Sequence, residues 1–187
     1  MEGTKLDYTS EWETEFTAKN GTKIVFRPEQ LGDTEMLWKM FSTLSKESVS
    51  NLLPPFTRDR VEGWTRNIDY DEVLAIVAVV EEENEQRIIG STSLKFSPQE
   101  ALKHKAELGL SVHDDHQNMG IGTALLNHVI EVAGMRKLSK VWLHISTYNN
   151  RAVHVYKKAG FRIEGKLSKE SRINGKYRDE YTMALFR

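Results

Sequence analysis

The run Gln-Asn-Met-Gly-Ile-Gly at residues 117–122 constrains the fold of this chain more than any other segment. It separates an apolar, strand-like stretch at 106–112 from a helical pattern at 123–136. Its two glycines allow a tight turn and a close approach of the backbone to a ligand. The following helix would present unpaired N–H groups at the positive end of its dipole. The run therefore predicts a pyrophosphate site, with a plain strand-to-helix turn as the alternative.

The same run disfavours two other nucleotide motifs. It is shorter than the Walker pattern and has no Lys-Ser/Thr ending, and it lacks the first glycine of the dinucleotide fingerprint. Nucleoside triphosphates and NAD are therefore not the expected ligands.

Length and composition favour one compact domain over residues 1–187, with residues 1–21 as an N-terminal strand extension. The 187 residues are 39% hydrophobic and 28% charged, which suits a single sizeable core. We find no apolar run of about 18 residues and no hydrophobic signal core at the start, so we expect a cytoplasmic protein with no membrane partner. The absence of cysteine excludes disulfides, thiolate metal sites and a cysteinyl intermediate.

Charge is distributed unevenly although the net charge is only −1. Residues 1–93 hold 10 basic and 18 acidic side chains, whereas residues 94–187 hold 16 basic and 9 acidic ones. This split indicates an anionic ligand for the second half and a cationic one for the first, with ordinary solvated charge as the alternative. The basic residues are dispersed, so we expect no nucleic-acid binding.

The order of predicted elements indicates an α+β fold with a central mixed sheet. An Asn20-Gly21 turn predicts a hairpin, Asp33 is a candidate N-cap for a helix that reaches Leu44, and Pro54-Pro55 prevents regular helix throughout 46–57. The predicted strands lie at 11–17, 22–27, 74–80, 87–96, 106–112, 141–145, 161–167 and 179–186, and the later helices at 58–66, 123–136 and 149–158. Asn174-Gly175 predicts the turn between the last two strands.

Three sequence blocks together carry a family resemblance. Gln117, Gly120 and Gly122 match a Gln/Arg-x-x-Gly-x-Gly/Ala turn; Asn149, Ala152, Tyr156, Gly160 and Phe161 match Asn-x-x-Ala-x-x-x-Tyr-x-x-x-Gly-Phe; and residues 164–167 with 173–180 form the third block. In these blocks the chain resembles the GNAT superfamily of N-acetyltransferases over about residues 22–187. The third block is similar to the polyamine and ribosomal-protein types, and residues 44–56 resemble the substrate-side loop of protein-lysine acetyltransferases.

The resemblance implies a mostly antiparallel sheet flanked by helices, in which splayed strands form an acetyl-CoA cleft. It further implies transfer of an acetyl group from acetyl-CoA, without a metal, directly to a primary amine in a ternary complex. The acceptor would be a polyamine, a protein N-terminus or lysine, or a small amine. Dimers are common in that superfamily, which makes a homodimer one expectation. A non-catalytic acyl-CoA-binding regulatory domain and an RNA-associated structural protein are the alternatives.

The resemblance also assigns residues to the donor site. Backbone groups of the strand would pair with pantetheine, backbone N–H groups of the turn would hold the pyrophosphate, and the side chains of Asn118, Met119 and Ile121 would be free to vary. The Asn149 amide would bind the cofactor, cap the next helix, or do both. The cofactor-binding set is Leu110, Ser111, Val112, Gln117, Asn118, Met119, Gly120, Ile121, Gly122, Thr123, Asn149 and Tyr156.

Two residues are candidates for proton transfer. The hydroxyl of Tyr156 could protonate the leaving CoA thiolate, with a core aromatic as the alternative role. An alkylammonium must lose a proton before it attacks, and Glu107 is the first candidate base; it could equally be a polar residue on an exposed strand face, with water carrying the proton. Asp179 and Tyr181 are weaker substrate-side candidates.

The sequence His113-Asp114-Asp115-His116 offers four potential metal ligands in four positions. Adjacent side chains of an extended chain point in alternating directions, so four consecutive ones rarely meet at one ion. We therefore interpret them as solvent-exposed turn residues.

Overall fold

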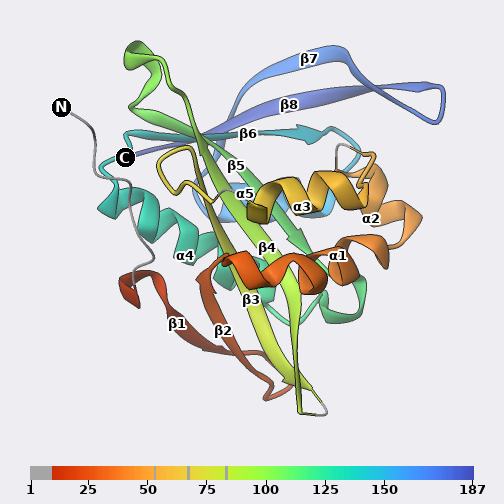
Figure 1. Ribbon diagram of the computed structural model, residues 1–187. Coiled ribbons are helices and arrows are strands. Elements are labelled where there is room, and N and C mark those ends of the chain that lie inside the picture. Colours follow the sequence, from red (N-terminus) through yellow and green to blue (C-terminus); the bar gives the residue numbers. More distant parts are fainter. Residues whose placement is uncertain (1–9, 53, 67, 83) are drawn as a thin grey trace.

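The computed structural model describes residues 10–187 except 53, 67 and 83. One sheet of eight strands runs through the molecule in the order β1-β2-β3-β4-β5-β6-β8-β7 (Figure 1). The strands are β1 (Thr14–Thr17), β2 (Lys23–Pro28), β3 (Val73–Glu82), β4 (Glu85–Phe96), β5 (Lys105–Val112), β6 (Lys140–Ser146), β7 (Arg162–Ile173) and β8 (Lys176–Phe186). The helices are α1 (Thr34–Ser42), α2 (Lys46–Ser50), α3 (Arg58–Arg66), α4 (Ile121–Met135) and α5 (Asn150–Lys158).

Strand pairing confirms the expected mixed, mostly antiparallel sheet. Strand β5 pairs with β6 in parallel, and every other neighbouring pair is antiparallel. A parallel pair needs a crossover, and α4 provides it between β5 and β6. The chain passes from the carboxyl end of β5 through α4 to the amino end of β6. The glycine turn therefore lies at the carboxyl end of β5.

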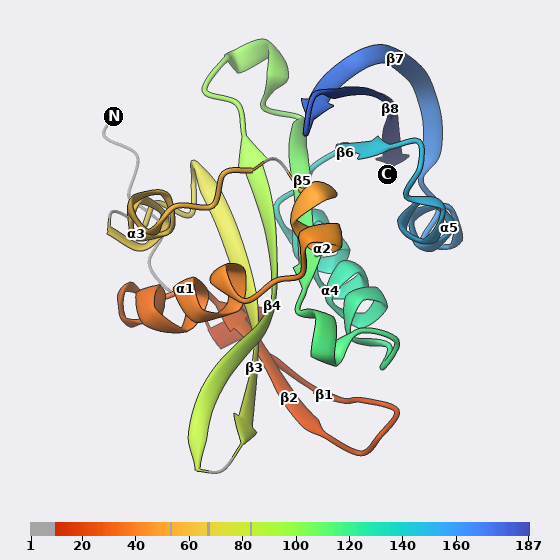
Figure 2. The same cartoon turned by 90° about the vertical axis from the view of Figure 1, so that its right-hand side faces the viewer.

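Helices cover both faces of the sheet (Figure 2). Helices α1 and α3 lie on one face, and α4 lies on the other against β4 and β5. Alternation along β3 separates two cores, because Leu74, Ile76 and Ala78 pack with α4 whereas Val77 and Val79 pack with α1 and α3. Burial on both faces explains why this strand reads as an uninterrupted apolar run.

The N-terminal hairpin differs from its prediction at the start. Thr17 pairs with Lys23 around Gly21, whose φ of +88° suits the predicted turn. Residues 10–12, however, form a 3₁₀ turn instead of extending the first strand. Trp12 is buried there and packs edge-on against Tyr70, with ring centroids 5.8 Å apart. Because the Trp12 indole is buried in the core, residues 10–12 do not continue strand β1.

Three further predictions are refined by the structure. Asp33 holds the N-cap position of α1, but its carboxylate binds Arg27 and the Gln30 amide rather than the helix. The segment 46–57 begins with the five-residue helix α2, capped by Ser45, before the Pro54-Pro55 break. Strands β7 and β8 extend further than predicted, up to the expected turn at Asn174-Gly175.

Within the described ranges, we find no helix that is both long enough and apolar enough to cross a membrane.

Candidate active site

Strands β5 and β6 separate part-way along their length. They pair from Lys105 and Lys140 to Glu107 and Trp142, whereas both strands continue for several residues beyond that point. The edge of β5 from Leu108 to Val112 is therefore open toward β6, as the resemblance implied. Two cavities meet at this opening, a larger groove beside the glycine turn and a smaller cavity beneath α1 and α3.

The larger groove has a volume of about 1250 Å³ and contains most of the predicted cofactor-binding set. Its lining includes Leu110, Ser111, Val112, Gln117, Asn118, Gly120, Gly122, Thr123, Asn149 and Tyr156. Gly120 is the N-cap of α4 with φ of +87°, a conformation that side chains with a Cβ rarely adopt. Since the first turn of a helix has free N–H groups, this end of the groove suits an anion.

Two members of the set do not face the groove with their side chains. Ile121 is only 1% exposed and belongs to the core between the sheet and α4, and Met119 packs against the same core. Packing constrains Ile121, because a buried side chain is fixed by its neighbours, while the expectation that these side chains can vary without loss of ligand binding stays a prediction. Any contact of Met119 and Ile121 with a ligand is left to their backbone groups.

Cations that the sequence reasoning missed line the same groove as the glycine turn. Lys19, Arg151 and Lys176 line the same groove. The Lys19 amide donates to the Met119 carbonyl at 3.2 Å, which joins the N-terminal hairpin to the turn, and Arg151 donates to Gln117 Oε1 at 2.9 Å. The three side chains come from β1–β2, α5 and β8, so spacing along the sequence could not have grouped them. Glycine turn and cations together fit the phosphates of coenzyme A.

Tyr156 lies where the two cavities meet and lines both. It is 6% exposed, and its ring packs against Phe161 with centroids 5.4 Å apart. Burial raises the pKa of its hydroxyl, so the phenol is protonated at neutral pH. Among the described residues its hydroxyl has no hydrogen-bond partner. The side chain can therefore donate a proton to a ligand.

Asn149 has the helix-capping role that was one of its two expected roles. Its Oδ1 accepts a hydrogen bond from the Ala152 amide at 3.1 Å at the start of α5. The residue also lines the larger groove. Since the cap occupies the oxygen, the amide nitrogen remains for a ligand.

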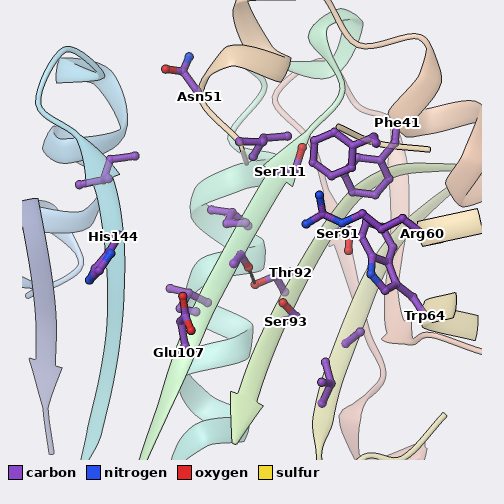
Figure 3. A pocket seen from close by; sticks show the side chains of 18 of the residues that line it. Phe41, Asn51, Arg60, Trp64, Ser91, Thr92, Ser93, Glu107, Ser111 and His144 are labelled. Atoms are coloured by element: carbon purple, nitrogen blue, oxygen red, sulfur yellow. Dashed lines mark hydrogen bonds between the residues drawn. The ribbon is translucent and has the colours of Figure 1, made fainter. Parts of the chain in front are cut away.

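The smaller cavity has a volume of about 480 Å³ and lies beneath aromatic side chains (Figure 3). Phe41, Phe56 and Trp64 form an aromatic cluster on its helical side, with the Arg60 guanidinium 5.0 Å from the Phe56 ring centroid. Its lining draws on the segment 44–56, which resembles a substrate-side loop, on α3, and on β7 and β8, including Ser50, Asn51, Leu52, Gly63, Ser171, Ile173, Arg178 and Glu180. This smaller cavity is a candidate acceptor site, and we call it the acceptor cavity.

Glu107 lines this smaller cavity from β5, and His144 lines it from β6 across the opening (Figure 3). The two strands diverge between them. His144 Nδ1 lies 3.9 Å from Glu180 Oε2, and Glu180 is itself 8% exposed. Glu107 and His144 thus both line the smaller cavity where it meets the larger groove, and sequence reasoning named only Glu107 as a candidate base.

Asp179 is directed elsewhere than predicted. Its carboxylate pairs with Lys166 at 2.7 Å and accepts from the Lys169 amide at 2.9 Å. The hydrogen bond from Lys166 lowers the pKa of this carboxyl. Tyr181 packs partly buried against the main core. Neither residue lines either of the two cavities, so these cavities do not support the expected substrate-side role, which stays a prediction.

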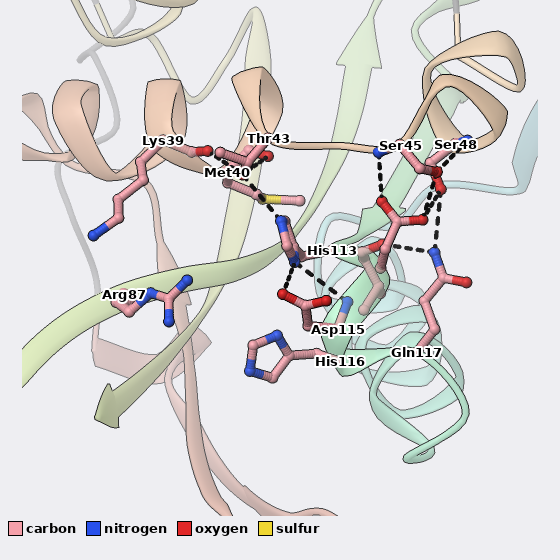
Figure 4. A network of polar contacts seen from close by, with 12 residues as sticks. Lys39, Met40, Thr43, Ser45, Ser48, Arg87, His113, Asp115, His116 and Gln117 are labelled. Carbon is pink, nitrogen blue, oxygen red and sulfur yellow. Dashed lines mark hydrogen bonds and ion pairs between the residues drawn. The ribbon is translucent and has the colours of Figure 1, made fainter. Parts of the chain in front are cut away.

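The segment 113–116 is structural, not a row of exposed turn residues (Figure 4). His113 is 7% and His116 9% exposed. His113 Nε2 bonds Thr43 Oγ1 at 3.0 Å, and His116 Nε2 bonds Glu82 Oε1 at 3.0 Å. The expected exposure is therefore wrong for the two histidines, whose partners lie in distant parts of the sequence, whereas Asp115 is exposed as expected. In the described part of the chain, no group of three potential ligands is placed around one ion.

Asp114 joins this segment to α2. Its carboxylate accepts from the Ser45 amide at 2.8 Å, from Ser45 Oγ at 2.8 Å and from Ser48 Oγ at 2.6 Å. Burial alone would raise the pKa of Asp114, but these hydrogen bonds outweigh it and lower the pKa. Gln117 Nε2 adds a bond to Ser48 Oγ at 3.3 Å. Asp114 and Gln117 thereby hold α2, whose last residue Ser50 lines the smaller cavity, against the start of the glycine turn.

A family model described as the acetyltransferase (GNAT) family matches residues 37–161, a span that includes the glycine turn, Asn149 and Tyr156. The chain belongs to the GNAT family. The GNAT fold is also found in the solved GNAT domain of S. lividans PAT, which superposes with a TM-score of 0.78 over 97% of this chain and 100% of that one, at 22% identity.

Two further proteins are similar to this GNAT chain. The spermidine N(1)-acetyltransferase of Vibrio cholerae is 33% identical over 85 residues, which are 45% of this chain and 49% of that protein. The chain thus spans about half the length of that curated relative. The structure of yncA, a putative acetyltransferase from Salmonella typhimurium with its cofactor acetyl-CoA, has a TM-score of 0.72 over 87% of this chain and 93% of that one, at 18% identity.

Proposed function

We propose that this GNAT protein is an N-acetyltransferase that moves the acetyl group of acetyl-CoA to a primary amine. The observation that carries the proposal is the position of Tyr156 between an anion-binding groove and an acceptor-sized cavity, at the opening between β5 and β6. The spermidine acetyltransferase relative and the acetyl-CoA complex of a structural neighbour support the same reading.

Acetyl-CoA supplies an acetyl thioester whose carbonyl carbon accepts the amine nitrogen. In the proposed direct transfer, the acceptor ammonium first loses one proton, which Glu107 would take directly or through water and pass to solvent. The C–N bond then forms, the nitrogen loses its second proton, and the C–S bond breaks. Tyr156 would protonate the leaving sulfur, and the second proton from the nitrogen would restore its hydroxyl. Free amides on the open edge of β5 would orient and polarise the carbonyl.

A screen of acceptors with acetyl-CoA tests the proposal. Free CoA is measured against spermidine, lysine-containing peptides, N-terminal peptides and simple amines, and mass spectrometry identifies the acetylated nitrogen. We expect CoA release that depends on an amine. Tight CoA binding without transfer to any amine would instead support the alternative, a non-catalytic acyl-CoA-binding domain.

A cytoplasmic location and a homodimer are part of the same proposal. Fractionation of cells tests the first, and light scattering on the purified chain tests the second.

A further inference from the structure

Glu29 is a buried carboxyl group at the end of the acceptor cavity farthest from the strand opening. It follows β2 directly, lines the cavity and is 4% exposed. Its amide donates to the Ala75 carbonyl and its carbonyl accepts from the Tyr70 hydroxyl, so its backbone is fixed. No hydrogen bond or ion pair joins its carboxyl group to another described residue.

The nearest cation is already neutralised. Arg27 binds Asp33 through two hydrogen bonds of 2.7 Å, and Asp33 is 2% exposed. Burial, reinforced by the negative charge of Asp33, raises the pKa of Glu29 to about 7, whereas Arg27 acts in the opposite direction. A buried carboxyl group that lacks a partner is costly to ionise, and a bound cation would remove that cost.

The position of Glu29 in the sheet sets a length for the ligand. One row of the sheet runs from Glu29 through Ala75 and Ser93 to Gly109 on β5. Three strand spacings separate its ends, about 14 Å. Gly109 leaves the space above this row of residues open, since a Cβ there would lie 3.0 Å from Ser93 Oγ. A short monoamine that reacts at the opening beside β5 could not reach Glu29.

The lining between the two ends suits an aliphatic chain that carries positive charge. The aromatic cluster of Phe41, Phe56 and Trp64 provides an apolar wall. Five carboxylates line the cavity against two guanidiniums, and these guanidiniums, Arg60 and Arg178, donate to the carbonyls of Pro55 and Ser50. The charged residues of the lining are Glu29, Arg60, Asp69, Glu72, Glu107, Arg178 and Glu180, together with His144.

We propose that Glu29 binds the distal ammonium group of the acceptor, which makes the acceptor an aliphatic diamine or polyamine. The inference rests on the proposed function, since it places the reacting amine at the opening between β5 and β6. The amine nearest Tyr156 receives the acetyl group, while the second nitrogen stays protonated against Glu29. Specificity for a second charge then lies in one residue outside the catalytic opening.

The test compares 1,8-diaminooctane with octylamine, which differ by one terminal amine. Binding to the CoA-loaded protein is measured by calorimetry and transfer by CoA release, for the wild type, Glu29→Gln and the control Glu81→Gln. Glu81 is exposed on β3, and its substitution removes the same charge outside the cavity. We expect Glu29→Gln to lower the preference for the diamine about tenfold or more, with octylamine and the control unaffected.

An unchanged preference in Glu29→Gln, or better transfer to lysine peptides independent of Glu29, would overturn the assignment while leaving N-acetyl transfer intact. Conversely, diamine binding that depends on Glu29 without any CoA release would support the assignment and reject the proposed function. Thermal unfolding of each variant verifies that it is folded.

Discussion

Glu107 and Trp142 form the last backbone pair between β5 and β6 before the two strands separate. Glu107 itself and Tyr156, the two proton-transfer residues of the proposed function, line the smaller cavity at the opening that follows this pair, and His144 lines it from β6. Because the parallel pairing ends early, backbone N–H and C=O groups of β5 beyond Glu107 have no partner on β6. A bound ligand can supply the missing hydrogen bonds. Strand separation therefore creates the candidate site.

Tyr156→Phe should lower kcat about a hundredfold or more and leave the dissociation constant of CoA unchanged. The phenylalanine ring keeps the packing against Phe161 and removes only the hydroxyl. Steady-state kinetics and calorimetry measure the two quantities. Tyr181→Phe is the matched control, because Tyr181 packs against the core outside both cavities. Equal kcat for Tyr156→Phe and wild type would exclude the proton-donor role.

Glu107→Gln should reduce kcat/KM most strongly near neutral pH and progressively less as the pH approaches 10. An alkylammonium with a pKa near 10 then loses its proton without help. The pH profile of kcat/KM from 6.5 to 10 measures this. His144→Gln is the companion variant, since His144 borders the same opening. If the kcat/KM of His144→Gln approaches the wild-type value at high pH and that of Glu107→Gln does not, the base is His144 on β6.

Gly120→Asp should weaken CoA binding more than tenfold, because it places a negative charge where the phosphates are expected. Gly120→Ala separates charge from backbone strain, since φ of +87° costs any side chain about 1–2 kcal/mol of stability. Calorimetry with CoA and urea unfolding measure the two effects. If alanine and aspartate weaken CoA equally, the phosphates do not lie at this turn.

The pKa of Glu29 predicts a pH dependence of stability. Because burial raises it from 4.5 to about 7, the unfolded chain ionises first as the pH rises, and the free energy of unfolding falls across this interval. The loss amounts to about 3 kcal/mol between pH 4.5 and 7. Glu29→Gln lacks this loss, so its stability relative to wild type should increase from pH 4.5 to 8. Urea unfolding at both pH values measures it; a constant difference would contradict the burial.

Local chemistry explains what the sequence could predict. The turn at Gly120, the cap at Asn149 and the two glycine turns of the hairpins depend on residues within a few positions, and the structure has them in place. Periodicity predicted most strands and the α4 helix for the same reason. The opening between β5 and β6 was predicted from the family resemblance, because no local sequence pattern indicates where two strands separate.

Long-range contacts explain what the sequence could not predict. His113 is buried by Thr43, 70 residues away, and His116 by Glu82, 34 residues away. Glu29 gives no local signal, since its burial depends on the chain near Tyr70. Residues such as these are ordinary polar positions until the sheet brings their partners together, and pattern reasoning then assigns them to the surface.

The last residue of helix α2, Ser50, and the two residues that follow it, Asn51 and Leu52, form a wall common to both cavities. At the start of α2, Asp114 accepts a hydrogen bond from the Ser45 amide. At the end of α2, Arg178 of β8 donates to the Ser50 carbonyl at 2.7 Å. A ligand that orders this wall spares the second ligand the entropy of doing so. Thermodynamic reciprocity then requires that CoA raise the affinity for the amine by the same factor by which the amine raises that for CoA. We therefore expect CoA and the amine to bind cooperatively across this shared wall.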